Sequence, residues 1–160
     1  MYSSINLWFD TARNGYIKLM KLLIKTGSTD LNKRDASCRI ALHSANVYGH
    51  KDCIEFLIKA GADLNKQDIY GYTSLHEASI HGHKDCVELL IKAGAILDIQ
   101  SNFGYTALHC ASIHNHKEII ELLIQSGVNV SIQTNDGCTA LVFAIRCDHK
   151  EIIELLEKTD

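Results

Sequence analysis

The chain has 160 residues, of which 46% are hydrophobic and 22% are charged, and its formal net charge is −3. This length suits one compact domain or about five units of about 33 residues. Lys and Arg nowhere cluster as densely as in nucleic-acid or membrane-surface patches, and no apolar run reaches the length of a membrane-spanning helix, about 18 residues. The N-terminus also lacks the basic-then-apolar pattern of a signal peptide. We therefore expect a cytoplasmic protein with no nucleic-acid and no membrane partner.

The first 32 residues contain two short stretches that predict a pair of helices, Leu7–Gly15 and Leu19–Ile24. Trp8 and Phe9 are predicted to cover the open end of the core. The segment lacks several features that the rest of the chain repeats. A terminal unit has nothing stacked on its outer side, so residues 1–32 are interpreted as a degenerate first unit.

From residue 33 onward the chain repeats itself in steps of 33 residues. A period of this size indicates a stack of similar supersecondary units. The units are assigned as 33–65, 66–98 and 99–131, with a shorter final unit at 132–160. Gly27 and Gly61 are 34 residues apart, so the loop at Ser28 and Thr29 is expected to carry one extra residue. The recurring residues are His43, His76 and His109; His50, His83, His116 and His149; and Gly61, Gly94 and Gly127.

One unit can be interpreted residue by residue in the segment 66–98. Thr73 suits the N-cap of a short helix, and the imidazole of His76 stands three residues later, where it can reach back to the Thr73 turn. Gly82 is expected to end this helix in a left-handed conformation. A second helix follows, with Asp85 in its first turn, where the helix dipole favours an anion. These features predict two helices per unit and require no catalytic chemistry.

Two units depart from this pattern. Cys38 stands where the other units have a glycine in the hairpin turn, and Ile40 stands where they have the N-cap threonine. The hairpin of the second unit is therefore expected to be the most distorted. In the last unit Glu157 stands where other units carry Ile58, Ile91 and Ile124. A charge at that place predicts that the C-terminal unit caps the stack.

The runs T-S-L-H-E-A-S-I-H-G-H-K-D-C-V-E-L-L-I-K-A-G-A and T-A-L-H-C-A-S-I-H-N-H-K-E-I-I-E-L-L-I-Q-S-G resemble ankyrin repeats. The resemblance covers roughly Lys33 to Lys158 and is weak before it. It implies an all-α, ankyrin-type helix-turn-helix solenoid with short β-hairpin-like loops and about five stacked repeats in a single domain, 1–160. The family's proline is absent, since Thr73 and Thr106 are followed by Ser and Ala, which are tolerated at a first helical position.

The resemblance also implies where a partner would bind, namely at the hairpin tips and the first helices. In the family's register these positions flank the glycine at the tip of the hairpin turn and precede the glycine that joins the two helices of a repeat. Aromatic side chains with a polar group are enriched at binding hot spots, although packing of hairpin against hairpin would also explain them here. The candidate partner-binding residues are Tyr48, Ile69, Tyr70, Tyr72, Ile80, His81, Phe103, Tyr105, Ile113, His114 and Arg146.

The cysteines and histidines suggest no further chemistry. Cys53 and Cys86 share one repeat position and are interpreted as buried, reduced thiols, whereas Cys138 and Cys147 fall on variable positions where exposure is possible. Seven of the nine histidines belong to repeat positions, so structural roles explain them better than metal binding. Phosphate loops and the H-E-x-x-H and G-x-S-x-G motifs are absent from the sequence. We expect no enzyme, no cofactor and no metal.

The sequence therefore predicts a monomeric, non-enzymatic protein–protein interaction module, acting as an adaptor, scaffold or inhibitor. The alternative is the targeting module of a larger enzyme, or of an effector that acts in a host cytosol, whose catalytic part is absent from this chain. Frequent Ile, Lys and Asn and the absence of proline suggest an AT-rich genome. Such a genome is compatible with the effector alternative, which we therefore retain. A pH- or metal-responsive module is a third possibility, because buried neutral histidines would make stability depend on pH.

Overall fold

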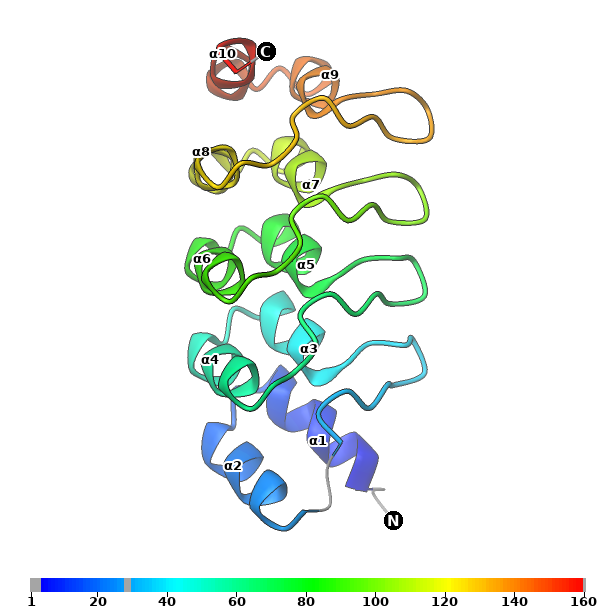
Figure 1. Cartoon of the computed structure of the whole chain (residues 1–160), viewed down its shortest axis with the longest axis vertical. Coiled ribbons are helices and arrows are strands. Elements are labelled where there is room, and N and C mark those ends of the chain that lie inside the picture. The colour runs from blue at the N-terminus through cyan, green and yellow to red at the C-terminus, as the bar shows by residue number, and fades with distance from the viewer. Residues whose placement is uncertain (1–3, 28–29, 160) are drawn as a thin grey trace.

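A computed structural model describes residues 4–27 and 30–159, with side chains from residue 7 onward (Figure 1). Within these ranges the chain forms ten helices and no strand. Five helix pairs follow one another along the long axis of the molecule. The helices are α1 (Ser4–Arg13), α2 (Ile17–Lys25), α3 (Ala41–Val47), α4 (Lys51–Lys59), α5 (Ser74–Ile80), α6 (Lys84–Lys92), α7 (Ala107–Ile113), α8 (Lys117–Gln125), α9 (Ala140–Arg146) and α10 (Lys150–Glu157).

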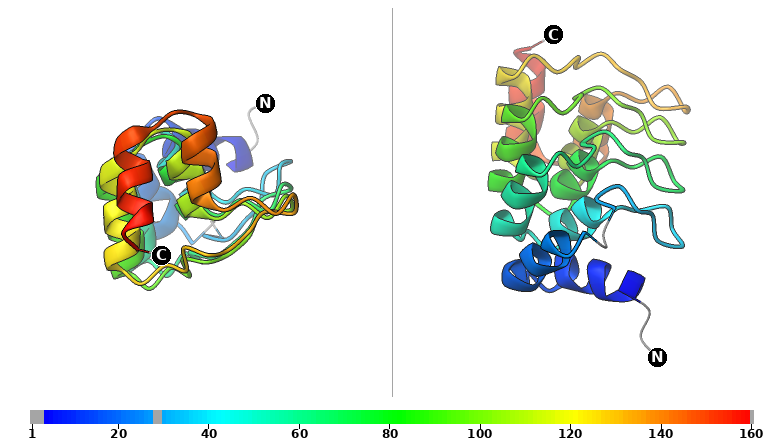
Figure 2. Two further views of the ribbon diagram at one scale, coloured as in Figure 1. Left: turned by 90° about the horizontal axis from the view of Figure 1, so that it is seen from above. Right: turned by 60° about the horizontal axis from the view of Figure 1, so that its bottom comes forward.

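The odd-numbered and even-numbered helices form two layers. Each first helix contacts the first helix of the next pair, from α1 through α3, α5 and α7 to α9, and the second helices contact one another in the same order. The view from above in Figure 2 shows the pairs superposed, with the hairpin loops projecting together to one side. This arrangement confirms the predicted all-α solenoid of about five stacked repeats.

Left-handed residues join the two helices of each pair, as the sequence predicted. Gly49 and Gly82 have φ angles of 68° and 74°, and the corresponding Asn115 and Asp148 have φ angles of 61° and 55°. Asn and Asp tolerate this region better than other residues with a Cβ atom, which explains why they replace glycine here. The sharp hinge lets a helix of nine residues fold back beside one of seven.

Buried histidines tie each hairpin to the next. The Nδ1 atom of His76 accepts hydrogen bonds from the Thr73 backbone N–H at 3.1 Å and the Thr73 hydroxyl at 2.8 Å. The Nε2–H group of the same ring therefore donates to the carbonyl of Tyr105, 2.9 Å away in the next repeat. His109 repeats this arrangement with Thr106 and with the carbonyl of Cys138. The predicted reach of the imidazole to the capping turn is confirmed, and it extends into the neighbouring repeat.

A second set of histidines lies at the hinge between the two helices of each pair and also connects neighbouring repeats. His83 and His116 donate from Nε2 to the carbonyls of Val47 and Ile80 in the preceding repeat, each at 3.0 Å. His149 instead uses Nδ1 and reaches Ser112, at 2.9 Å. A Cβ atom at Gly82 would lie 2.5 Å from Cε1 of His116.

Asn115 carries that Cβ atom at the equivalent place. The ring of His149 cannot occupy the position that His116 takes over Gly82, and its different hydrogen bond follows from this exclusion.

The core runs without interruption along the stack. Trp8 and Phe9 are 1% and 5% exposed and join the apolar cluster that includes Leu42, Leu75 and Leu108. Both side chains thus belong to the continuous core at the N-terminal end of the stack. The extra residue expected at Ser28 and Thr29 lies outside the described residues.

The prediction of a distorted second hairpin is wrong. Cys38 adopts a left-handed φ of 59°, and its N–H still donates to the carbonyl of Asp35 at 3.0 Å. The turn closes as it does at Gly71, whose N–H donates to Asp68 at the same distance. Ile40 supplies no capping oxygen, yet its N–H still donates to Nδ1 of His43 at 3.3 Å. The hydrogen bonds of this hairpin are thus kept despite the two substitutions.

The cysteine predictions hold except at one position. All six thiols are free, and Cys53 and Cys86 are buried, which raises the pKa of Cys86 to about 11. Cys147 is exposed, but Cys138, for which exposure was possible, is only 6% exposed. Cys138 is buried because its carbonyl and its N–H bind His109 and Thr134 at the base of the hairpin.

Candidate partner-binding surface

Backbone hydrogen bonds hold the hairpin tips in line. The N–H groups of Ile69, Asn102 and Asn135 donate to the tip carbonyls of the preceding hairpins, at distances of 3.1, 2.9 and 3.1 Å. Side chains add to this ladder, since the amide of Asn102 donates to the carbonyl of Ile69 at 2.9 Å. Within one tip, Oδ1 of Asp68 accepts from the N–H groups of Tyr70 and Tyr72, each at 2.9 Å. The tips therefore present their side chains from a fixed frame.

Three predicted binding residues stand out from these tips into solvent. Tyr70 and Phe103 are each 54% exposed, and Ile69 is 46% exposed. Large apolar side chains of this kind gain most from being covered by a partner. Because the backbone beneath them is ordered, covering them costs little conformational entropy.

Tyr72 and Tyr105 behave differently from the exposed tip residues. Both are half-buried, and the ring of Tyr72 meets the ring of His76 edge-on with centroids 5.3 Å apart. Tyr105 packs in the same way on His109, at 6.1 Å. Burial also raises the pKa of the Tyr72 hydroxyl. These two tyrosines hold the hairpins against the first helices, as well as lining the surface.

A second group of predicted residues lies at the C-terminal ends of the first helices. Tyr48 is 52% exposed, and His81 and His114 are exposed as well. Each of these rings stacks on the hinge histidine two residues later, with centroids 6.1 to 6.2 Å apart. Ile80 and Ile113 are half-buried beside them. The hinge thus presents a row of flat rings with fixed orientation.

Phe143 joins the hairpin side of the surface to the helix ends, and the sequence prediction missed it. Its ring centroid lies 5.4 Å from that of Tyr105, and the guanidinium of Arg146 lies over its face at 5.8 Å. The register already contained the signal, because Phe143 occupies the position of Ser44, Glu77 and Cys110 on the inner side of the first helices. Arg146, which was predicted, is therefore held in place by an aromatic neighbour.

Glu77 is the other residue that the prediction missed. Its side chain is only 13% exposed, and Nε2 of His81 lies 3.7 Å from its carboxylate. Burial and the neighbouring histidines lower the pKa of His81, so this imidazole favours the neutral form. Within the described part of the chain, no N–H or O–H group donates a hydrogen bond to this carboxylate. Burial, together with the nearby charge of Asp68, raises the pKa of Glu77. The surface therefore contains a partly desolvated acid in its central repeat.

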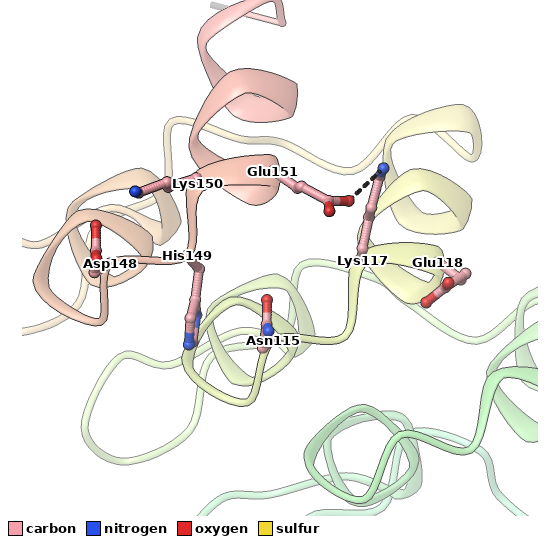
Figure 3. A pocket seen from close by; sticks show the side chains of 7 residues that line it. All are labelled: Asn115, Lys117, Glu118, Asp148, His149, Lys150 and Glu151. Atoms are coloured by element: carbon pink, nitrogen blue, oxygen red, sulfur yellow. Dashed lines mark hydrogen bonds and ion pairs between the residues drawn. The ribbon is translucent and has the colours of Figure 1, made fainter.

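One hollow in the described part of the chain lies away from the hairpin tips and is polar. Figure 3 shows a cavity of about 380 Å³ between the last two hinges, lined by charged residues. The Nζ atom of Lys117 and Oε2 of Glu151 pair across it at 2.8 Å. The described residues contain no group of three or more His, Cys, Asp or Glu side chains placed to hold a metal ion. This cavity offers neither the apolar area of the hairpin surface nor a ligand set.

The fold, the capping histidines and the hinge glycines together define a helical repeat solenoid. Comparison with known families gives a match to ankyrin repeats in three copies over residues 8–101 and 93–160. Since these matches cover almost the whole chain, the chain belongs to the ankyrin repeat family. It is also similar to ankyrin repeat domain-containing protein 29 of Danio rerio, with 39% identity over 57 residues, which is 36% of this chain and 19% of that protein.

Proteins of this family generally serve as protein–protein interaction modules and are generally not catalytic. No helix among the described residues has both the length and the apolar character needed to cross a bilayer.

Proposed function

We propose that this chain binds a protein partner through one surface, made of the hairpin tips and the first helices, and that it does so without catalysis. The observation that carries the proposal is the exposure of Tyr48, Tyr70 and Phe103 on a backbone fixed by hydrogen bonds between repeats. Aromatic anchors of this size dominate binding energies when a partner covers them. The chain acts as an adaptor, scaffold or inhibitor by covering or joining what it binds.

The chemistry of the surface also narrows the partner. The side chains of Tyr70, Phe103 and Ile69 fit an apolar segment, and the partly desolvated carboxylate of Glu77 fits a Lys or Arg side chain next to that segment. A Lys or Arg side chain that reaches Glu77 would offset the solvation that the carboxylate has lost. We therefore expect a partner with basic and apolar side chains close together, acting in a reducing compartment such as the cytosol.

A second role is the targeting module of a longer protein. The chain matches only 19% of the length of its curated relative, so in that protein such repeats form part of a larger whole. A host-directed effector would use the same surface. Both roles depend on the same residues, so the test of the surface serves them equally.

The test is affinity capture from a cell lysate, quantified by mass spectrometry. The wild-type chain is compared with a Tyr70→Ser/Phe103→Ser double variant and with Ile96→Ser. Ile96 is 56% exposed in the loop that follows α6, away from the hairpin tips. Partners that are lost at least tenfold with the double variant and retained with Ile96→Ser support the proposal. Equal capture by all three chains overturns it, and so does equal loss in both variants.

A further inference from the structure

A row of side chains runs along the inner side of the first helices and the bases of the hairpins. The thiol of Cys110 lies close enough to the Tyr72 hydroxyl and to Glu77 to interact electrostatically with both. The ring of Tyr105 continues the row to Phe143, with centroids 5.4 Å apart. These contacts connect three repeats into one strip. We call it the inner row, and it consists of Tyr72, Glu77, Tyr105, Cys110, Phe143 and Arg146.

The two ends of the inner row carry charges of opposite sign. Glu77 in α5 is 13% exposed, and Nε2 of His81 lies 3.7 Å from its carboxylate. Arg146 in α9 is exposed one helical turn after Phe143, and its guanidinium lies over that ring at 5.8 Å. Among the residues whose side chains the structure describes, no carboxylate forms an ion pair with this guanidinium. The row therefore has an acid at one end, a base at the other and mainly aromatic rings between them.

The other charged groups beside the row already have partners. Arg39 stands at the register of the half-buried tyrosines, and its Nε atom pairs with Oδ2 of Asp35 at 3.4 Å. Oδ1 of Asp68 accepts hydrogen bonds from two backbone N–H groups of its own hairpin, each at 2.9 Å. Glu77 and Arg146 are therefore the charges that the row offers to a partner.

The distance between the two charges sets a minimum length for a segment that pairs with both. Two junctions separate them, from α5 to α7 and from α7 to α9 (Figure 1). Packed helices lie about 8–10 Å apart, so the charges are about 16–20 Å apart along the stack. An extended chain covers this distance in about five or six residues, and a helix in about eleven to thirteen. Neighbouring residues of a partner cannot reach both charges.

We propose that the inner row selects a partner segment in which a Lys or Arg side chain and an Asp or Glu side chain flank an apolar stretch. The base pairs with Glu77, the apolar side chains cover Tyr72 and Tyr105, and the acid pairs with Arg146. This inference rests on the proposed function and adds to it the acid, the spacing and the direction of the segment. A segment laid the opposite way would set like charges together, which is strongly unfavourable.

The two ends should contribute unequally to affinity. Glu77 has already lost part of its hydration in the folded chain, so pairing with a base costs the carboxylate little further desolvation. Arg146 is exposed, and water and salt weaken its attraction for an acid. We expect Glu77→Gln to weaken binding about tenfold and Arg146→Gln about threefold. An uncharged residue is compatible with the fold at the first position, because Ser44 and Cys110 share its register.

The test begins with a displayed library of random peptides of about 16 residues, which is long enough for the helical spacing. The library is selected on the full chain under reducing conditions. Peptides that bind the wild type, and are lost with the Tyr70→Ser/Phe103→Ser variant, should carry a base and an acid at one of the two expected spacings. Their apolar residues should lie between the two charges.

Double-mutant cycles on one selected peptide then assign each charge. Changing its base to Met should weaken binding to the wild type about tenfold and binding to Glu77→Gln hardly at all. Changing its acid to Gln should likewise have no further effect on Arg146→Gln. Glu154→Gln and Lys84→Gln are matched controls, because both residues are exposed on second helices away from the inner row, and they should bind like the wild type.

The outcomes separate this inference from the proposed function. Peptides that depend on Tyr70 and Phe103 but carry no base and acid coupled to Glu77 and Arg146 overturn the inference and leave the proposed surface in place. Coupling at one end alone, or a base and an acid side by side, also overturns it. A library that yields no peptide dependent on the two tip rings overturns the inference and the proposed function together.

Discussion

The first helices at the centre and at the C-terminal end of the stack have the same length and the same place, but they use it differently. Helices α5 and α7 bury His76, His109, Ser79 and Ser112 against the following repeat. Helix α9 has Val142 and Ile145 at those registers, and both are at least partly open to solvent. The two buried histidines thus bond the following repeat, whereas the buried serines beside them only fill space at the junction.

Directed hydrogen bonds between repeats accompany the apolar core along the stack. A buried histidine that satisfies two backbone groups fixes the register of its neighbour. An apolar residue in its place fills the space but makes no hydrogen bond that would fix the register of the neighbouring repeat. Substitutions along the stack test this difference.

Replacing His76 with Ala should destabilise the chain by about 4 kcal/mol, because the Thr73 N–H and the Tyr105 carbonyl lose their partner in a buried place. Val142→Ala is the matched control at the same register and should cost about 1 kcal/mol or less, since that side chain is half-exposed. Urea unfolding monitored by circular dichroism measures both values. Similar losses in the two variants would contradict a special role for the histidine.

Stability should fall as the solution is acidified below pH 6.5. Burial lowers the pKa of His76 from 6.5 to about 4, and it also lowers the pKa values of His43 and His109. Between these pKa values the unfolded chain binds protons that the folded chain refuses, so the stability present above pH 6.5 is lost toward pH 4. From pH 7.5 to pH 5, His76 alone should account for about 2 kcal/mol.

The same urea titration, repeated at pH 7.5, 6 and 5, measures this loss. A His76→Gln variant should start less stable at pH 7.5 and show a shallower decline. Parallel curves for the variant and the wild type would mean that the proton is taken up elsewhere.

Gly82→Ala should destabilise the chain by about 2 to 3 kcal/mol, because an added Cβ atom meets His116 at 2.5 Å in a left-handed backbone. Gly94→Ala has the same backbone strain and no atom within 4 Å of the new Cβ, so it should cost about 1 kcal/mol. Thermal unfolding of the two variants separates strain from contact. Equal shifts in the unfolding temperature of the two variants would show that the ring of His116 moves aside freely, as the ring of His149 does beside Asn115.

Tyr72→Ala and Tyr70→Ala should separate folding from binding. The first should cost about 2 kcal/mol of stability, because the ring packs on His76 and is half-buried. The second should change stability by less than about 0.5 kcal/mol, since the ring is 54% exposed. A Tyr70→Ala variant that unfolds as easily as Tyr72→Ala would assign the tip rings to the fold.

Much of the fold follows from the sequence because each repeat obeys local rules that the chain states several times. The spacing of the histidines, the capping Thr73 and the hinge residue Gly82 predicted helix pairs and their connections. What the sequence did not show depends on neighbouring repeats. The burial of Cys138 comes from its carbonyl bond to His109, and the regular hairpin at Cys38 comes from the ladder above it.

The candidate surface was predicted by position and refined by exposure. The register placed Tyr70 and Tyr72 in one group, but only the structure shows that one ring faces solvent and the other supports the hairpin. Phe143 and Glu77 share one register position, which lies outside the family's binding positions and holds the small residues Ser44 and Cys110 in two other repeats. The contact of Phe143 with Tyr105 joins residues far apart in the sequence, and the burial of Glu77 beside the predicted His81 appears only in the structure.

The most direct test of the central claim is amide hydrogen exchange on this chain with and without a partner captured through it. Binding through the hairpin surface should slow exchange at the tips, residues 68–72 and 101–105, and at the C-terminal ends of α5 and α7. Exchange in α4, α6 and α8 should stay the same. Protection confined to those second helices, with unchanged tips, would contradict the account.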